Sequence, residues 1–211
     1  VKASYAGASA TCVIRVLPTV KVPAIPAIYA APQVNATLAD IDLNTIVKGA
    51  EGTFTWKDSS VKFADYAGAD SMHAEALYTV KGRKPVSVLV PVDLVWITGV
   101  NIGAYDKTRA DGQYYITLPD SMKKDEKIVL CAELLTNNSS KEAVDLLKKY
   151  VKEGKLSVKW TDKEKGELLS EELVSESAVF APRSYTATAK GKKTLQVSVM
   201  SAISKKAIAT G

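Results

Sequence analysis

Catalytic chemistry in this chain of 211 residues would have to use a single histidine, His73. A Ser-His-acid triad needs a histidine as its base, and a multi-histidine zinc site needs several. His73 lies between Met72 and Ala74 at the start of a predicted strand, which is typical of an ordinary surface histidine. The sequence also lacks a Gly-x-Ser-x-Gly elbow, a phosphate-binding glycine loop and a His-Glu-x-x-His motif. We therefore expect no catalytic residue and no enzyme.

The acidic residues offer oxygen ligands but no defined site. There are 23 of them, so pairs of the kind that hydrolyse glycosides arise by number alone, and no pair is singled out. Two groups fall in predicted loops, where calcium binds: Asp65, Asp70 and Glu75, and separately Asp106 and Asp111. Neither has the regular spacing of a calcium loop. We interpret them as solvated turn residues and expect no metal and no cofactor.

Adjacent tyrosines give the one candidate binding face. Tyr114 and Tyr115 follow each other on a predicted strand, so their rings point to opposite faces and at least one is exposed. An exposed tyrosine can stack on a sugar ring, which makes Tyr114 and Tyr115 the candidate ligand-binding residues. The alternative is one core tyrosine and one surface tyrosine.

Tryptophans mark two stretches of similar pattern. Leu156–Asp162 and Thr53–Asp58 both alternate apolar and polar residues and end in Trp-x-Asp or Trp-Lys-Asp. Period-two alternation places the apolar side chains on one face of a strand. We therefore expect Trp56 and Trp160 to be structural core residues on equivalent central strands of two β-sandwich modules.

Composition and charge narrow the class of protein. With 46% hydrophobic and 24% charged residues, the chain has the composition of a globular protein. Its net charge of +5 is modest, and the lysines are balanced by an acidic run from Asp162 to Glu176, so we expect no nucleic-acid partner. No apolar run approaches the roughly 20 residues of a membrane helix, so we expect no membrane insertion.

The two cysteines, Cys12 and Cys131, fall in different predicted modules and have no metal-ligand spacing. We expect both to be small, buried and reduced.

Residues 1–32 are predicted to form a hairpin followed by an extended segment. Alternating residues around Ala6-Gly7-Ala8-Ser9 predict a hairpin over residues 1–18, which either closes an upstream module or completes the next one; we favour the first. A similar pattern over Tyr185–Val199 predicts a closing hairpin. Four prolines from residue 18 to residue 32 predict an extended linker or an edge strand. Because the chain starts at Val1, we expect it to be a piece of a longer protein.

Alternating apolar residues predict a module over residues 19–93. Leu38, Ile41 and Leu43 predict an early strand, and alternation up to Val80 predicts another. A closing strand over residues 86–92 contains Pro91, which is typical of a sheet edge.

A further module is predicted over residues 94–211. Its first strand would include Leu94 and Trp96. Ser139 and Glu142 have capping-box spacing before an apolar stripe, and Gly154 follows as a C-terminal cap, so we predict a helix over residues 139–153 inserted between two strands. Residues 201–211 are interpreted as an exit linker.

Short motifs in these regions resemble bacterial immunoglobulin-like (Ig-like) repeats. The two predicted hairpins, Val1–Pro18 and Tyr185–Val199, look like the ends of such repeats. The middle, with Gly-Thr-Phe-Thr-Trp-Lys-Asp at residues 52–58 and Val-Leu-Val-Pro-Val at residues 88–92, is similar to a related repeat of secreted bacterial proteins. The resemblance implies a mostly β fold of tandem Ig-like antiparallel β-sandwiches, the second with one inserted α-helix at residues 139–153.

Such repeats serve as stalks, spacers or adhesive modules, and they share no catalytic residues. The resemblance therefore implies a non-catalytic structural or adhesive segment of a bacterial secreted or surface protein, located outside the cell. Its partner would be a glycan or another surface protein, and the segment would be a monomeric piece of a larger chain. The alternatives are a carbohydrate-binding module that uses Tyr114 and Tyr115, or an accessory region of a glycan-degrading enzyme.

Overall fold

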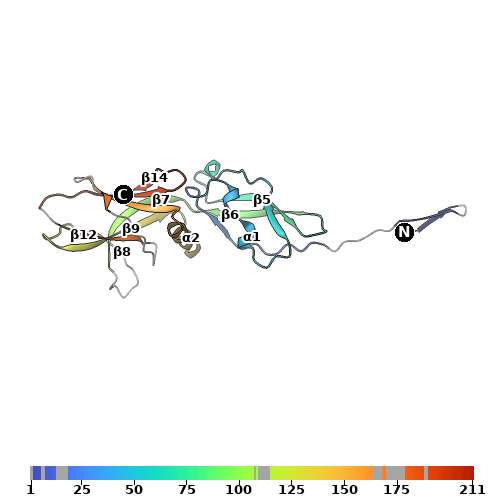
Figure 1. Ribbon diagram of the computed structural model, residues 1–211, viewed down its shortest axis with the longest axis horizontal. Coiled ribbons are helices and arrows are strands. Elements are labelled where there is room, and N and C mark those ends of the chain that lie inside the picture. The colour runs from blue at the N-terminus through green and yellow to red at the C-terminus, as the bar shows by residue number, and fades with distance from the viewer. Residues whose placement is uncertain are drawn as a thin grey trace.

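The chain is mostly β and elongated. The computed structural model describes residues 2–5, 8–12, 19–106, 108, 115–163, 168–169, 179–187 and 190–211. Within these ranges the strands form one two-stranded and three four-stranded sheets. Figure 1 shows an N-terminal hairpin at one end of the long axis, followed by two packed units. In the part of the chain that the structure describes, no helix has the length and apolar character needed to cross a membrane.

The N-terminal hairpin stands apart from the remaining sheets. Strands β1 (Lys2–Tyr5) and β2 (Ala8–Thr11) pair antiparallel, with Lys2 opposite Thr11. They form a sheet of their own, and Figure 1 shows it at a distance from the next unit. The hairpin therefore does not complete the sheet that follows it. Its assignment to an upstream module stays a prediction.

The N-terminal unit, residues 19–94, contains one sheet rather than the two of a sandwich. The strand order is β3-β6-β5-β4, and β3 runs parallel to β6 while the other pairs are antiparallel. These strands are β3 (Ile28–Ala30), β4 (Thr53–Trp56), β5 (Ser71–Thr79) and β6 (Val86–Leu94). Three short helices add one buried core residue each: η1 (Leu38–Asp40), α1 (Leu43–Ile46) and η2 (Phe63–Tyr66). The expectation of an antiparallel sandwich is therefore wrong for residues 19–94.

The predicted early strand over Leu38–Leu43 is wrong because local side-chain bonds favour helical turns. The Asp40 carboxylate accepts hydrogen bonds from the backbone N–H groups of Ala36 and Thr37, at 2.7 and 3.1 Å. The Asp42 carboxylate caps α1 by accepting from the Asn44 N–H, at 2.9 Å. Such Asp side chains compete with strand pairing for the backbone groups.

Pro91 does not mark a sheet edge, because β6 lies between β3 and β5. The backbone N–H of Lys57 donates to the Glu75 carbonyl, which makes the odd-numbered residues of β5 point their backbone groups toward β4. Pro91 lies opposite His73, so the backbone groups of this pair point away from each other. The missing proline N–H therefore removes no bond between β5 and β6.

The C-terminal unit has two four-stranded sheets around one core. One sheet has the order β12-β9-β7-β8 and the other β11-β10-β13-β14. The strands of the first are β7 (Ile97–Tyr105), β8 (Tyr115–Ile116), β9 (Lys127–Thr136) and β12 (Val179–Thr186). Those of the second are β10 (Leu156–Asp162), β11 (Leu168–Leu169), β13 (Leu195–Ser201) and β14 (Ala207–Thr210). Buried side chains of both sheets belong to one cluster, as in a sandwich.

Two predictions at the C-terminal end are wrong. β12 and β13 do not form a hairpin: β12 pairs with β9, and β13 pairs with β10 and β14, so the chain between them changes sheet. Residues 201–211 are not an exit linker, since they include β14, and Gly211 exchanges two backbone hydrogen bonds with Val197 at 3.0 and 3.1 Å. A side chain at Gly211 would meet the Val100 carbonyl, so the backbone packs closely there.

Helix α2 (Lys141–Lys152) lies between β9 and β10, where the sequence predicts a helix. Its N-cap is Ser140, whose hydroxyl accepts from the Ala143 N–H at 3.2 Å, one residue later than the predicted Ser139. Gly154 has a φ of 71° and donates to the Val151 carbonyl, as expected of a glycine after a helix. The helix buries one face against the second core: Ala143, Leu147, Tyr150 and Val151.

The junction between the two units is built by two passes of the chain. Leu94 ends β6 and β7 starts at Ile97, so Leu94 and Trp96 do not belong to a first strand of the C-terminal unit. Trp96 packs against the first core and donates its Nε1–H to the Ala69 carbonyl at 2.7 Å. The earlier pass contributes Ala31 and Val34, which follow β3 but are buried in the second core. Each core therefore contains residues from the part of the sequence that mainly forms the other unit.

Side-chain amides pair the backbone at this junction. The Asn137 carboxamide donates to the Asp70 carboxylate and the Leu94 carbonyl, at 2.9 and 3.0 Å, and accepts from the Trp96 N–H at 2.8 Å. Gln33 forms a two-way pair with the backbone of Ile97, at 3.0 and 3.2 Å. These bonds join segments that are 41 to 67 residues apart in sequence.

A second, buried part of the junction network centres on Asn35. Its side-chain carbonyl accepts from the Tyr150 hydroxyl at 2.7 Å and from the Ala31 N–H at 3.1 Å. Burial raises the pKa of the Tyr150 hydroxyl, so it stays a neutral donor to Asn35. Helix α2 is thereby tied to the segment that follows β3.

The two tryptophans expected to be equivalent occupy different positions. Trp160 is only 1% exposed and lies on β10, an inner strand, between Leu169 and Val197. Trp56 lies on the edge strand β4 and is half-buried at the border of the first core, with its Nε1–H donated to the Ile41 carbonyl at 2.9 Å. Phe54 is the fully buried aromatic residue of β4.

We predict that Trp160→Ala lowers the free energy of unfolding by about 3–5 kcal/mol, because it removes a buried side chain and leaves a cavity. Trp56→Ala should lower it by about half as much, since part of the indole is already in water. Chemical denaturation followed by circular dichroism measures both. Leu89→Ala is the control, because Leu89 is 62% exposed. Equal losses for the two tryptophans would contradict the difference in burial.

Candidate functional site

The structure describes only one of the two tyrosines predicted to bind a ligand. Tyr114 lies outside the residues that the structure describes. Tyr115 begins β8, an edge strand, and its backbone lies opposite Tyr105 on β7. A ligand-binding role for Tyr114 and Tyr115 therefore stays a prediction.

His73 and its acidic neighbours in sequence do not converge. His73 is exposed on β5. The Glu75 carboxylate forms an ion pair with Lys57, and the Asp70 carboxylate accepts from Asn137 at the junction. Across the described ranges, no three His, Cys, Asp or Glu side chains lie close enough to hold a metal ion.

The cysteines differ in environment. Cys131 on β9 is buried, whereas Cys12 is exposed, so the expectation of burial is wrong for Cys12. No disulfide joins the two residues. Burial, together with the nearby charge of Glu133, raises the pKa of the Cys131 thiol to about 12.

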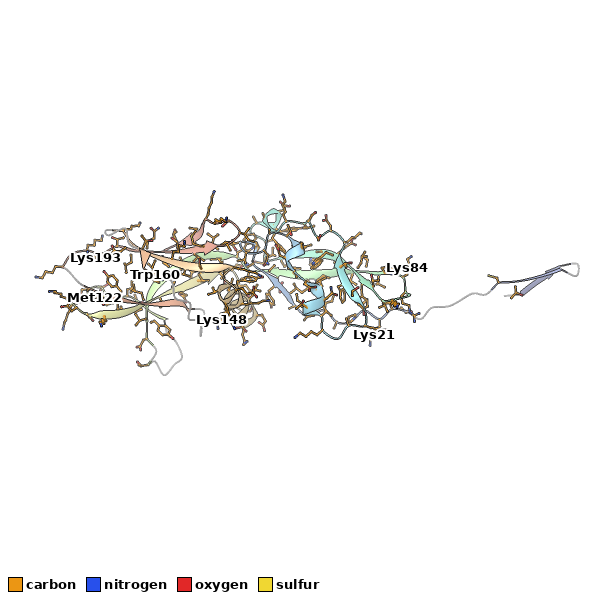
Figure 2. All side chains as sticks on the ribbon, viewed as in Figure 1. Lys21, Lys84, Met122, Lys148, Trp160 and Lys193 are labelled. Carbon is orange, nitrogen blue, oxygen red and sulfur yellow. The ribbon has the colours of Figure 1, made fainter. Side chains whose placement is uncertain are left out.

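A hollow with a lysine rim lies at the far end of the C-terminal unit. Its volume is about 520 Å³, and Figure 2 shows Met122 and Lys193 at this end, away from the junction. Half-buried apolar side chains form its walls: Leu118, Met122, Ile128, Tyr185 and Leu195. Lys124, Lys190, Lys192 and Lys193 also line it, against one acidic residue, Asp120.

A second hollow, which we call the β5-edge hollow, lies in the N-terminal unit within residues described without a gap. Its volume is about 460 Å³. One wall is four consecutive residues of β5, Met72 to Glu75, and the other comes from the chain after β4 and from η2: Lys57, Asp58, Val61 and Tyr66. Buried Leu38 also contributes to the lining.

Charges of both signs lie on the rim of the β5-edge hollow. The hydrogen bond and charge of Lys57 lower the pKa of the Glu75 carboxyl. The pKa of the Asp58 carboxyl is lowered by hydrogen bonds from the Ser60 hydroxyl and N–H, at 2.6 and 2.9 Å. Both carboxylates therefore stay ionised at neutral pH, and Lys57 offsets one of them.

Sequence reasoning missed the β5-edge hollow. The available signal is Asp58-Ser59-Ser60, an Asp-Ser turn that ends the pairing of β4 before it reaches the start of β5. No known protein family and no curated protein matches this chain.

We predict that Lys57→Met raises the pKa of Glu75 toward the ordinary value of a glutamate. The lowered pKa means that this pair stabilises the fold above the unfolded-state pKa, and that the contribution is lost as the pH falls through the folded-state pKa. An NMR titration of the Glu75 side chain measures the shift. Lys62→Met, at another exposed lysine, is the matched control, and an unchanged Glu75 titration in Lys57→Met would show that the pair does not form in solution.

The thiols should differ in reactivity. At pH 8 we expect an alkylating reagent to modify exposed Cys12 and to leave Cys131 unmodified until denaturant is added, because the Cys131 thiol is buried and protonated. Mass spectrometry of peptides from native and unfolded samples reads out both sites. Rapid labelling of Cys131 in the native protein would contradict its burial.

Proposed function

We propose that this chain is a non-catalytic structural or adhesive segment, a stalk, spacer or adhesin module, of a bacterial secreted or cell-surface protein. Its modules would be Ig-like and would follow one another along the chain. The short motifs shared with Ig-like repeats support this proposal, and so does the elongated arrangement in Figure 1.

The main support for the proposal is the junction between the two units, where they share core residues and hydrogen bonds. A spacer must hold its modules at a fixed angle, and a flexible linker does not. Here two passes of the chain, shared core residues and the amide pairs of Gln33, Asn35 and Asn137 join the units. The hydrogen bonds of Gln33 and Asn35, and that of Asn137 to the Leu94 carbonyl, are buried or half-buried, which makes independent rotation of the units costly.

The two-sheet core of the C-terminal unit is compatible with an Ig-like sandwich, whereas the single sheet of residues 19–94 departs from it. A stalk role does not require both units to have the same fold. It requires each to bury enough apolar surface to stay folded outside the cell, and each unit has its own buried cluster.

The location can be tested directly. Antibodies raised against the chain should label intact, unpermeabilised cells of the organism that encodes it, or detect the protein in the medium. Detection only after the cells are opened would contradict a surface or secreted role. A cytosolic protein of the same organism serves as the control for cell lysis.

The alternative role, a carbohydrate-binding module, depends on Tyr114 and Tyr115. A glycan array separates the two proposals: reproducible binding that is lost on substitution of both tyrosines by alanine would favour the carbohydrate-binding module. A chain that binds no glycan leaves the structural role as the better account.

The rigidity of the junction gives a further prediction. Asn137→Ala removes the acceptor for Trp96 and the donor for Leu94 and Asp70, so the free energy of unfolding should fall by about 1–3 kcal/mol. We expect the wild-type units to tumble as one body in ¹⁵N relaxation and to separate partly in this variant. Asn44→Ala is a control for loss of a structural amide away from the junction, and two independent correlation times in the wild type would contradict a fixed angle.

A further inference from the structure

Among the residues that the structure describes, no strand pairs with the first half of β5 on the side of β4. β4 pairs with residues 76–79 of β5, and the Lys57 N–H adds one bond to Glu75. The chain then turns away at Asp58 and bonds to η1 instead, through the Ser59 and Val61 carbonyls. The start of β5 is therefore left as a sheet edge.

The open edge presents a donor and an acceptor of the backbone. Because the Glu75 carbonyl points toward β4, period-two alternation directs the N–H and C=O of His73 to the same side. Within residues 19–106, all described, no backbone group is recorded as pairing with His73 from this side.

The β5-edge hollow lies along this edge. Successive residues of a strand point to opposite faces, so a hollow lined by four in a row, Met72 to Glu75, must lie beside the strand and not over one face. Its volume of about 460 Å³ is within the roughly 300–1,000 Å³ range of ligand pockets. Val61 and Tyr66, both half-buried, supply an apolar wall.

The neighbouring part of the same sheet edge, along β4, is covered. Asn44 of α1 donates to the Phe54 carbonyl at 2.9 Å and accepts from the Phe54 N–H at 2.7 Å, so a side-chain amide covers the outer edge of β4. Covering an edge in this way prevents unwanted pairing. At His73 the corresponding groups face a hollow with an apolar wall.

We propose that the β5-edge hollow binds an extended segment of a partner polypeptide, which continues the sheet beyond the end of β4 by pairing with the backbone of His73. An apolar side chain of the partner packs against Val61 and Tyr66, and polar side chains on either side of it meet Lys57, Asp58 and Glu75. A peptide fits better than a glycan, because the N–H and C=O of one strand residue, directed to the same side, complement the backbone of another extended peptide. The assignment rests on the adhesive role proposed above and names its class of partner.

A displayed library of seven-residue peptides, selected against the full chain, tests the proposal. We expect selected peptides with one apolar position between polar ones to slow hydrogen exchange of the His73 amide at least tenfold. N-methylation of the peptide residue opposite His73 should weaken binding at least tenfold, because it removes a ladder hydrogen bond. This measurement leaves the protein unchanged.

Two protein variants probe the same site. Val61→Glu places a charge on the apolar wall, and His73→Pro removes the backbone donor without removing a bond recorded in the fold; each should weaken binding at least tenfold. Ile203→Glu, at an exposed apolar side chain of the C-terminal unit, is the matched control and should bind as the wild type does. Thermal melts verify that each variant is folded before its binding is compared.

Three results would overturn the proposal: a library that yields no binder, binders unaffected by N-methylation and by Val61→Glu, or glycan binding at this hollow in place of peptide binding. Surface labelling of cells with antibody is independent of all three. Failure of peptide binding with intact surface labelling would remove the docking site alone, whereas loss of surface labelling would remove the proposed function.

Discussion

The structure depends on satisfying backbone hydrogen bonds where the chain passes between two cores. Backbone-to-backbone pairing, such as the Val95 N–H bond to the Ala30 carbonyl, covers only part of this crossing, and an unpaired buried group costs about 1–3 kcal/mol. The carboxamides of Gln33, Asn35 and Asn137 take the place of a neighbouring strand there. Because each amide both donates and accepts, these three residues fix the direction in which β6 leaves one unit and β7 enters the next. The serial arrangement of the molecule follows from that direction.

The same chemistry decides which sheet edges stay open. Asn44 covers the outer edge of β4, and β14 closes the β10–β13 sheet next to β7, with Gly211 packed against Val100. The start of β5 has no such cover. An uncovered strand edge can pair with other chains and cause aggregation. The charges of Lys57, Asp58 and Glu75 around this edge disfavour pairing with arbitrary strands and leave room for the proposed partner segment.

Periodicity predicts single strands well in this chain and their neighbours poorly. The alternation in β5 and β10 is strong, and both are strands with alternating burial; the capping pattern before Gly154 is local, and α2 lies there. The Leu38–Leu43 stretch misleads because Asp40 and Asp42 capture backbone groups that a strand would use. Equivalent-looking Trp56 and Trp160 diverge because strand order, which no local pattern encodes, makes β4 an edge and β10 an inner strand. The β5-edge hollow could not be predicted for the same reason, since it exists only where one strand stops before its neighbour.

The parallel pairing of β3 with β6 has a mechanical consequence. Both strands run toward the junction, so tension between the N-terminal hairpin and the C-terminal unit pulls β3 back along its axis while it draws β6 forward. The hydrogen bonds between Ile28–Ala30 and Val92–Leu94 are then loaded together in shear, and they do not break one after another as in unzipping. Three residues of β3, the shortest strand of its sheet, would thus act as a clamp that protects the rest of the unit from being drawn out.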